Sequence, residues 1–182
     1  MIVAAVIAIA VKAFVAQAFF IPSASMEPQL TAGDRVVVSR LAYELHDPRR
    51  GDILVFDDPN ADERSDDSFP LVRWGRDALE GVGVVRPEDD ELIKRVVALP
   101  GETVEGRDGI VVIDGRPLLE PYLDGAETPA FGPVDVPEGH VFVMGDNRTN
   151  SLDSRSFGPV PVDTVVGRAI ARVWPPGRVA YL

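Results

Sequence analysis

The sequence contains no cysteine and only two histidines, His46 and His140, among its 182 residues. The lack of cysteine excludes disulfides, thiolate nucleophiles and cysteine-ligated zinc. The two histidines are far apart and do not form the HExxH spacing of a zinc protease, so a histidine-built metal site is not expected. We therefore predict that the protein uses neither a metal nor another cofactor.

Positive charge is also scarce, because the formal net charge is −11. This balance argues against nucleic acid as a partner, since phosphates require a basic face. Only two of the 18 basic residues are lysines, Lys12 and Lys94. A buried lysine can lose its proton near neutral pH, whereas arginine cannot. The two lysines are therefore present either by chance or because their positions require a basic residue that can lose its proton.

A long apolar run opens the chain: residues 1–21, "MIVAAVIAIAVKAFVAQAFFI", are interrupted only by Lys12 and Gln17. As a helix rising about 1.5 Å per residue, this run matches a hydrocarbon core of about 30 Å, and we predict a transmembrane anchor. A secretory signal peptide is the main alternative, because Ala16–Ala18 has the Ala-x-Ala pattern of a cleavage site. A buried core helix is the third interpretation.

Residues 22–182 favour short extended runs separated by 16 prolines and 16 glycines over the whole chain. The pattern predicts a mostly β domain with an antiparallel, barrel-like sheet. Asp114-Gly115 favours a type I′ hairpin turn. Residues 57–91 are acidic at both ends and are predicted to be an inserted solvated loop, with a possible short helix around Trp74 to Leu79. The predicted strands lie within residues 35–43, 52–56, 92–99, 110–113, 116–123, 140–145 and 164–174.

Lys94 lies in the predicted strand "LIKRVVAL". Strand alternation places Leu92, Val96 and Ala98 on its face, so that face is apolar. Burial there would lower the lysine pKa from about 10.4 towards 8 at a cost of roughly 3 kcal/mol, which would make Lys94 a general base. The alternative is an edge-strand lysine that extends to water.

Two polar stretches contain hydroxyls that a lysine base could serve. "IPSASMEPQL", residues 21–30, places Ser23 and Ser25 directly after the apolar run. "MGDNRTNSLDSRSFG", residues 144–158, follows the apolar "HVFV". Loop serines are mostly exposed or cap helices, and the second stretch could equally be an Asx-rich turn with a surface ion pair. Its other interpretation is a polar network that orients catalytic groups.

Four segments together resemble the conserved boxes of bacterial type I signal peptidases, in the same order: "PSASMEPQL", "RRGDILVF", "LIKRVVALPGE" and "GDNRTNSLDSR". Members of this family are membrane-anchored serine proteases with a Ser-Lys dyad. The resemblance covers the apolar segment and almost all of the β domain. Gln29 and Thr149 depart from it, since many relatives have threonine and an acidic residue there.

The resemblance implies a role for each matching residue. Ser25 matches the nucleophile and Lys94 the general base. Ser23 matches the residue whose hydroxyl, with the Ser25 backbone N–H, forms the oxyanion hole. Ser151 matches a residue that hydrogen-bonds and orients the lysine. Three further residues match positions that hold the site together, namely Asp146, Asp153 and Arg155.

The resemblance also implies the substrates and the location. The expected substrates are exported pre-proteins, cut after small residues in an Ala-x-Ala pattern. The expected enzyme is a monomer in contact with membrane lipid, anchored once in a bacterial plasma membrane with residues 22–182 on the extracytoplasmic side. Three alternatives remain open: a membrane-tethered β-rich binding module, a Ser-Lys self-cleaving repressor-type protease, and a Ser-His-Asp hydrolase using His46 or His140.

Overall fold

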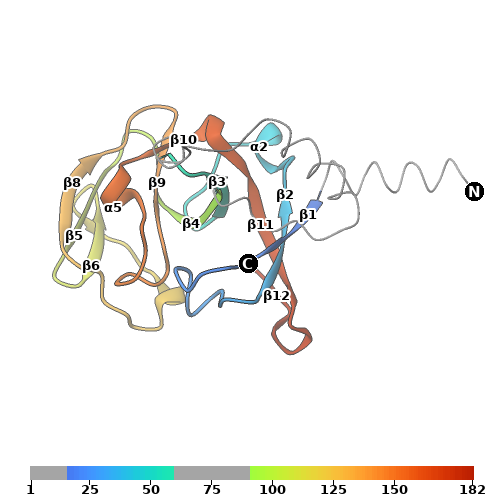
Figure 1. Ribbon diagram of the computed structural model, residues 1–182. Coiled ribbons are helices and arrows are strands. Elements are labelled where there is room, and N and C mark those ends of the chain that lie inside the picture. Colours follow the sequence, from blue (N-terminus) through green and yellow to red (C-terminus); the bar gives the residue numbers. More distant parts are fainter. Residues whose placement is uncertain (1–15, 60–90) are drawn as a thin grey trace, which may run out of the picture.

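The computed structural model describes residues 16–59 and 91–182. These residues form two antiparallel sheets, which confirms the expected mostly β class (Figure 1). The large sheet has the order β1-β2-β11-β3-β4-β9-β10, with β12 beside β11. Its strands are β1 (Ala16–Phe20), β2 (Arg35–Ser39), β3 (Ile53–Asp57), β4 (Glu91–Ala98), β9 (His140–Met144), β10 (Val160–Pro161), β11 (Val165–Trp174) and β12 (Ala180–Tyr181).

The small sheet is inserted between β4 and β9 and has the order β7-β6-β5-β8. It consists of β5 (Thr103–Arg107), β6 (Ile110–Ile113), β7 (Arg116–Pro117) and β8 (Phe131–Asp135). Asp114 and Gly115 connect β6 to β7, both with positive φ, as the predicted type I′ turn requires. Short helices complete the described fold: α2 (Ala42–Leu45), η2 (Pro121–Leu123), α5 (Ser154–Phe157), η3 (Val162–Thr164) and η4 (Pro176–Arg178).

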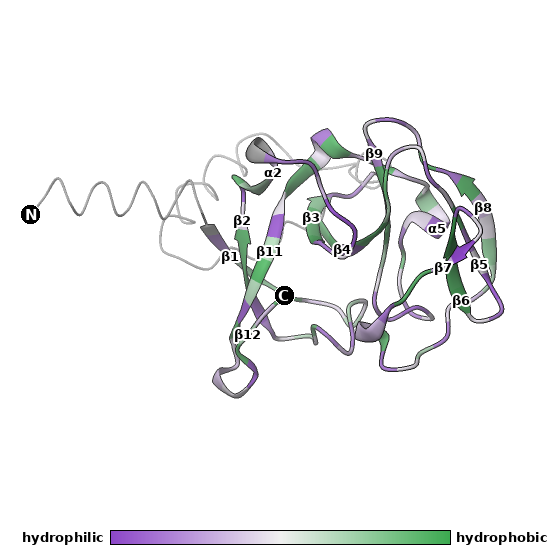
Figure 2. Cartoon of the chain, turned by 180° about the vertical axis from the view of Figure 1, so that it is seen from behind, coloured by the Kyte–Doolittle hydropathy of each residue, from purple (hydrophilic) through white to green (hydrophobic). Residues whose placement is uncertain are grey.

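Buried side chains form three clusters, and the strands carry most of them (Figure 2). The β3 strand contributes to two clusters, because Ile53 and Val55 face one side while Leu54 and Phe56 face the other. The remaining cluster joins the sheets, with Phe142 and Met144 of β9 among its members. The large sheet, which carries Lys94 in β4, is therefore covered on both faces.

The amino-terminal prediction needs a correction, because residues 16–20 form strand β1 rather than the end of a helix. The β1 strand pairs antiparallel with β2, and Phe19 and Ile21 are buried in the same cluster as Val36 and Val38. Apolar residues at the end of the run thus serve the protein core. Residues 1–15 lie outside the described part, and within that part no helix has the length and apolar character needed to cross a membrane.

Other predicted elements were partly right. Residues 42–45 form the helix α2 instead of continuing the β2 strand, and the predicted strand at 116–123 is reduced to β7 followed by η2. The insertion interrupts a strand pair, because Asp57 at the end of β3 is paired with Glu91 at the start of β4. The possible helix at Trp74–Leu79 falls outside the described residues.

Candidate active site

Lys94 and Ser25 are brought together across 69 positions of sequence. The Lys94 ammonium nitrogen lies 3.0 Å from the Ser25 hydroxyl oxygen and also donates to the Ile93 carbonyl at 2.8 Å. Lys94 is 3% exposed and Ser25 9%. The pair is therefore a buried hydroxyl and amine within hydrogen-bond reach, the arrangement that nucleophile activation requires.

The β4 strand explains the burial of Lys94. It lies between β3 and β9, so Lys94 is not the edge residue of the alternative interpretation. Leu92 and Val96 pack in the cluster formed with Leu54 and Phe56, as the predicted alternation requires. Ala98 departs from that pattern and packs with Val97 in another cluster, because the β4–β9 register shifts between Val96 and Ala98.

Burial also sets the charge state of Lys94. Desolvation lowers the pKa of the ammonium group to about 8, while the negative charges of Asp153 and Asp58 oppose that change. A substantial fraction of the amine is therefore neutral at mildly alkaline pH, as a general base requires.

The Ser25 segment is held by apolar anchors on either side. Ile21, Met26 and Leu30 are buried in the cluster that contains Val36 and Val38, and the Leu30 N–H donates to the Met26 carbonyl at 2.8 Å. Ser23 is exposed, and its hydroxyl oxygen lies 3.3 Å from that of Ser25. The two predicted hydroxyls thus lie side by side, one at the surface and one against Lys94.

Residues 145–153, which follow β9, close over the Ser25 backbone. The Asn147 N–H donates to the Ser25 carbonyl at 3.0 Å, and the Asn147 side-chain amide donates to the Ala24 carbonyl at 3.1 Å. Gly145 permits this approach, because a Cβ there would lie 2.4 Å from the Ser25 carbonyl oxygen and 2.2 Å from the Ser151 hydroxyl oxygen. Any side chain at position 145 would push these segments apart.

Ser151 is a correction to the predicted network. Its hydroxyl oxygen is buried but has no hydrogen-bond partner in the described part of the chain, so the expected hydrogen bond to Lys94 is not formed. The hydroxyl instead packs against Gly145, beside the Ser25 carbonyl. Its sequence position indicated proximity to the site but could not determine where the hydroxyl points.

Asp153 and Arg155 hold the 145–153 segment in shape. Asp153 caps α5 and accepts from the Gly145 N–H at 2.9 Å. Arg155 donates to both Asp153 carboxylate oxygens at 2.8 Å and to the Arg148 carbonyl at 2.6 Å. Since Asp153 is fully buried, these bonds offset the cost of removing its charge from water.

Asp146 forms a second buried pair, with Arg95 of β4. The Arg95 guanidinium donates to the two Asp146 oxygens at 2.8 and 2.7 Å. Burial raises the pKa of the Asp146 carboxyl, and the two Arg95 hydrogen bonds oppose this. The residue next to the candidate base is thus tied to the segment that covers the candidate nucleophile.

Some residues of the site were not among the predicted ones. The sequence did contain an indication of the role of Arg95, because a charged residue inside an apolar strand requires an acidic partner. The sequence contained no such indication for Glu120 and Tyr122, because their contacts with Arg148 and Arg95 join segments that are distant in sequence. No group of three or more His, Cys, Asp or Glu side chains within the described residues could hold a metal ion.

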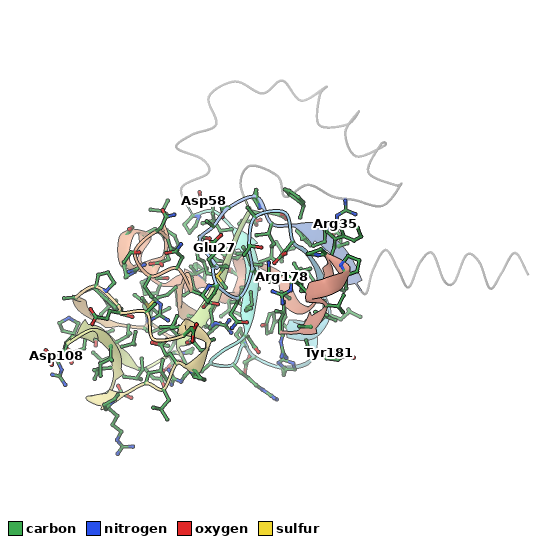
Figure 3. The ribbon with its side chains drawn as sticks, turned by 90° about the horizontal axis from the view of Figure 1, so that it is seen from below. Glu27, Arg35, Asp58, Asp108, Arg178 and Tyr181 are labelled. Atoms are coloured by element: carbon green, nitrogen blue, oxygen red, sulfur yellow. The ribbon has the colours of Figure 1, made fainter. Side chains whose placement is uncertain are left out.

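A cavity of about 370 Å³ lies beside the segment that carries Ser25. Its walls come from three parts of the chain that are separate in sequence. They are Glu27 and Pro28, Ala126 and Glu127, and residues 146–149. In Figure 3, Glu27 lies between Asp108, which is in the turn from β5 to β6, and Tyr181 of β12 from left to right.

Comparisons with known proteins place these motifs in a family. Residues 1–174 match the model of the family described as signal peptidase, peptidase S26. The signal peptidase I of Mycobacterium tuberculosis is 42% identical over 209 residues, covering 97% of this chain and 71% of the relative. A probable signal peptidase I-1 of Synechocystis sp. is 42% identical over 184 residues, covering 100% of this chain and 83% of the relative. A crystal structure of a signal peptidase I from Enterococcus faecalis V583 is 33% identical, with a TM-score of 0.47, covering 68% of this chain and 97% of that one.

Proposed function

The chain belongs to the signal peptidase family, peptidase S26, and from this membership we propose that it removes signal peptides from exported pre-proteins with Ser25 as nucleophile and Lys94 as general base. The observation that supports these two roles is the 3.0 Å contact between the Lys94 amine and the Ser25 hydroxyl in a buried site.

The proposed reaction proceeds in two steps. Neutral Lys94 takes the proton of the Ser25 hydroxyl as its oxygen attacks the scissile carbonyl. The resulting ammonium then protonates the leaving amine, which departs with the mature protein. Lys94 next removes a proton from water as the water oxygen attacks the ester carbonyl between Ser25 and the signal peptide. The Lys94 ammonium then returns this proton to the departing Ser25 oxygen, which restores the Ser25 hydroxyl and the neutral amine and releases the signal peptide as a carboxylic acid.

The proposed oxyanion hole consists of the Ser23 hydroxyl and the Ser25 backbone N–H. Ser23 precedes Ser25 by two residues, and its hydroxyl oxygen lies 3.3 Å from that of Ser25. Asp146, Asp153 and Arg155 are proposed to support the site from behind. The proposed cleavage after small residues would follow from shallow pockets that exclude larger side chains.

The proposed location is a bacterial plasma membrane, with residues 1–15 as part of the anchor and the β domain on the extracytoplasmic side. The apolar composition of these residues supports the tether. We also propose that the enzyme acts as a monomer and meets its substrates at the lipid surface.

The test is cleavage of a purified pre-protein with an Ala-x-Ala site, in detergent, by the wild type and three variants. Cleavage should be lost, with the fold retained, in Ser25→Ala, Lys94→Ala and Lys94→Arg. The last variant should be inactive because arginine keeps the positive charge but cannot be deprotonated. Lys12→Arg is the matched control, since Lys12 is the other lysine of the chain, and it should cleave like the wild type.

Two outcomes would contradict the proposal. Cleavage by Lys94→Ala would assign the base to another group, such as one of the two histidines. Binding of the pre-protein by the wild type without any cleavage would favour the membrane-tethered binding module.

A further inference from the structure

The four residues Glu120–Leu123, here named the 120–123 turn, lie at the end of the small sheet's second hairpin, with Pro121–Leu123 forming η2. In Figure 1 this turn is the short yellow coil at the lower edge of the molecule, next to the blue segment after β1. We infer that Glu120 and Tyr122 of this turn are positioning residues for the active site. The inference rests on the proposed function, since it concerns the same reaction.

Glu120 holds the segment that covers Ser25. Its carboxylate accepts two hydrogen bonds from the Arg148 guanidinium, at 2.9 and 2.5 Å. The Arg148 side chain is 1% exposed and that of Glu120 6%, so the ion pair is almost fully removed from water. Arg148 follows Asn147, whose two N–H donors bind the Ser25 and Ala24 carbonyls. The position of the nucleophile backbone therefore depends on where Glu120 holds Arg148.

Tyr122 contacts the strand that carries the candidate base. The Arg95 guanidinium carbon lies 4.0 Å from the centre of the Tyr122 ring, a close cation–π contact. Arg95 is the neighbour of Lys94, and its guanidinium is also bound to Asp146. The aromatic ring thus covers one face of the Arg95 guanidinium, whose N–H groups already bind the Asp146 carboxylate.

The turn connects these two contacts to each other. The Tyr122 hydroxyl donates to Glu120 at 2.6 Å, so the ring and the carboxylate form one unit. The Tyr122 carbonyl accepts a long hydrogen bond of 3.5 Å from the Gln29 side chain, four residues beyond Ser25. One turn of the small sheet's hairpin region therefore touches three segments, which carry Ser25, Lys94 and Asn147.

Glu120 acts through Arg148 and Tyr122 acts through Arg95, rather than on Ser25 or Lys94 directly. Removing Glu120 would leave the Arg148 cation buried without this carboxylate, and the 145–153 segment would have to move to expose it. A displacement of about 1 Å at a reacting group can lower a rate by about 10²-fold. We expect kcat to fall by about 10- to 100-fold in Glu120→Ala and Tyr122→Leu.

The experiment measures kcat and KM on an Ala-x-Ala pre-protein, using full-length variants in detergent. Each kcat is divided by the folded fraction, obtained from tryptophan fluorescence in a denaturant titration. Tyr122→Phe keeps the ring over Arg95 and loses only the hydroxyl, so it should retain more activity than Tyr122→Leu. Glu120→Gln keeps an acceptor oxygen and should lie between the wild type and Glu120→Ala. The pH at which kcat/KM reaches half its maximum should stay near that of the wild type, because the burial of Lys94 does not involve this turn.

Glu102→Ala is the matched control. Glu102 also binds an arginine at 2.5 Å, but this partner is Arg50, and the two side chains further bond the backbone of Val97 and Leu99. The control should lower the midpoint of unfolding without changing kcat per folded molecule. An unchanged kcat per folded molecule in both Glu120→Ala and Tyr122→Leu would overturn the inference. Loss of cleavage by the wild type itself would instead overturn the proposed function.

Discussion

Lys94 is buried beside Ser25 among apolar side chains, and this burial lowers the pKa of its amine to about 8. An exposed lysine would be almost wholly protonated at neutral pH and could not accept a proton from a hydroxyl. The residue type and its surroundings are therefore equally necessary for a lysine base. The same surroundings make the protonated form costly.

The pH dependence of cleavage follows from this pKa. Only the neutral amine accepts the Ser25 proton, so kcat/KM should rise about tenfold per pH unit below pH 8 and level off above it. The measurement is kcat/KM on a peptide substrate between pH 6 and pH 10. A rise centred near pH 6.5 would point to histidine as the base and contradict the role of Lys94.

The burial that lowers the pKa of Lys94 should also lower the free energy of unfolding at neutral pH. The lysine pKa is about 8 in the fold against 10.5 ordinarily, and this difference corresponds to about 3 kcal/mol of destabilisation at pH 7. Lys94→Met removes that cost but also loses hydrogen bonds to Ser25 and Ile93, together worth about 2 kcal/mol. The variant should be inactive and about 1 kcal/mol more stable at pH 7.

The way in which the stability gain of Lys94→Met changes with pH provides an internal control. The destabilisation is complete below pH 8, falls as the pH rises towards 10.5, and is lost above pH 10.5, where lysine is neutral in both states. The stability gain of Lys94→Met should therefore shrink between pH 8 and pH 10.5 in denaturant titrations. A variant less stable than the wild type at pH 7 would contradict this account.

At the level of elements, β1 is where the sequence prediction and the structure differ most. Its five residues pair with β2, and Phe19 is 3% exposed within the cluster that contains Val36 and Val38. That cluster also contains Met26, the residue after Ser25. The β1 strand therefore helps to anchor the segment that carries the candidate nucleophile.

Shortening a β1 side chain should therefore destabilise the domain. Phe19→Ala should lower the free energy of unfolding by about 3 kcal/mol, because a fully buried aromatic side chain leaves a cavity. Tyr181→Ala is the control, since Tyr181 is 95% exposed, and it should change stability by less than about 0.5 kcal/mol. Equal effects in denaturant titrations would mean that β1 is not part of the folded core.

At the scale of the whole molecule, all the candidate catalytic groups belong to the large sheet or its connections. Ser25 precedes β2, Lys94 lies in β4, and residues 145–153 follow β9. The small sheet supplies support in two ways. Its residues Val104 and Val111 pack against Phe142 and Met144 of β9, and the 120–123 turn binds Arg148. The part that carries the chemistry is thus distinct from residues 1–15, to which we assign the tether.

This separation predicts that a chain starting at Ala16 keeps its activity on a short soluble peptide, because it retains β1 and every described contact. The same chain should leave the membrane fraction after cell lysis, since a hydrophobic anchor is its proposed attachment. The measurements are kcat/KM on the peptide and the partition between membrane and supernatant. Persistent membrane binding would assign the attachment to the β domain instead.

The sequence alone determined the properties that depend on neighbours along the chain. Strand alternation predicted the apolar face of Lys94, Asp114-Gly115 predicted its hairpin turn, and the order of motifs identified the family. The end of the apolar run was misjudged, because hydrophobicity alone cannot distinguish a membrane helix from a strand buried in a core.

Only the tertiary structure decided which distant side chains meet. The 3.0 Å contact of Lys94 with Ser25, the pairing of Arg95 with Asp146 and that of Arg148 with Glu120 each join segments far apart in sequence. The register of β3, β4 and β9, including the shift after Val96, sets where these side chains point. Such contacts depend on the packing of the whole chain, and a local pattern of residue types does not contain that information.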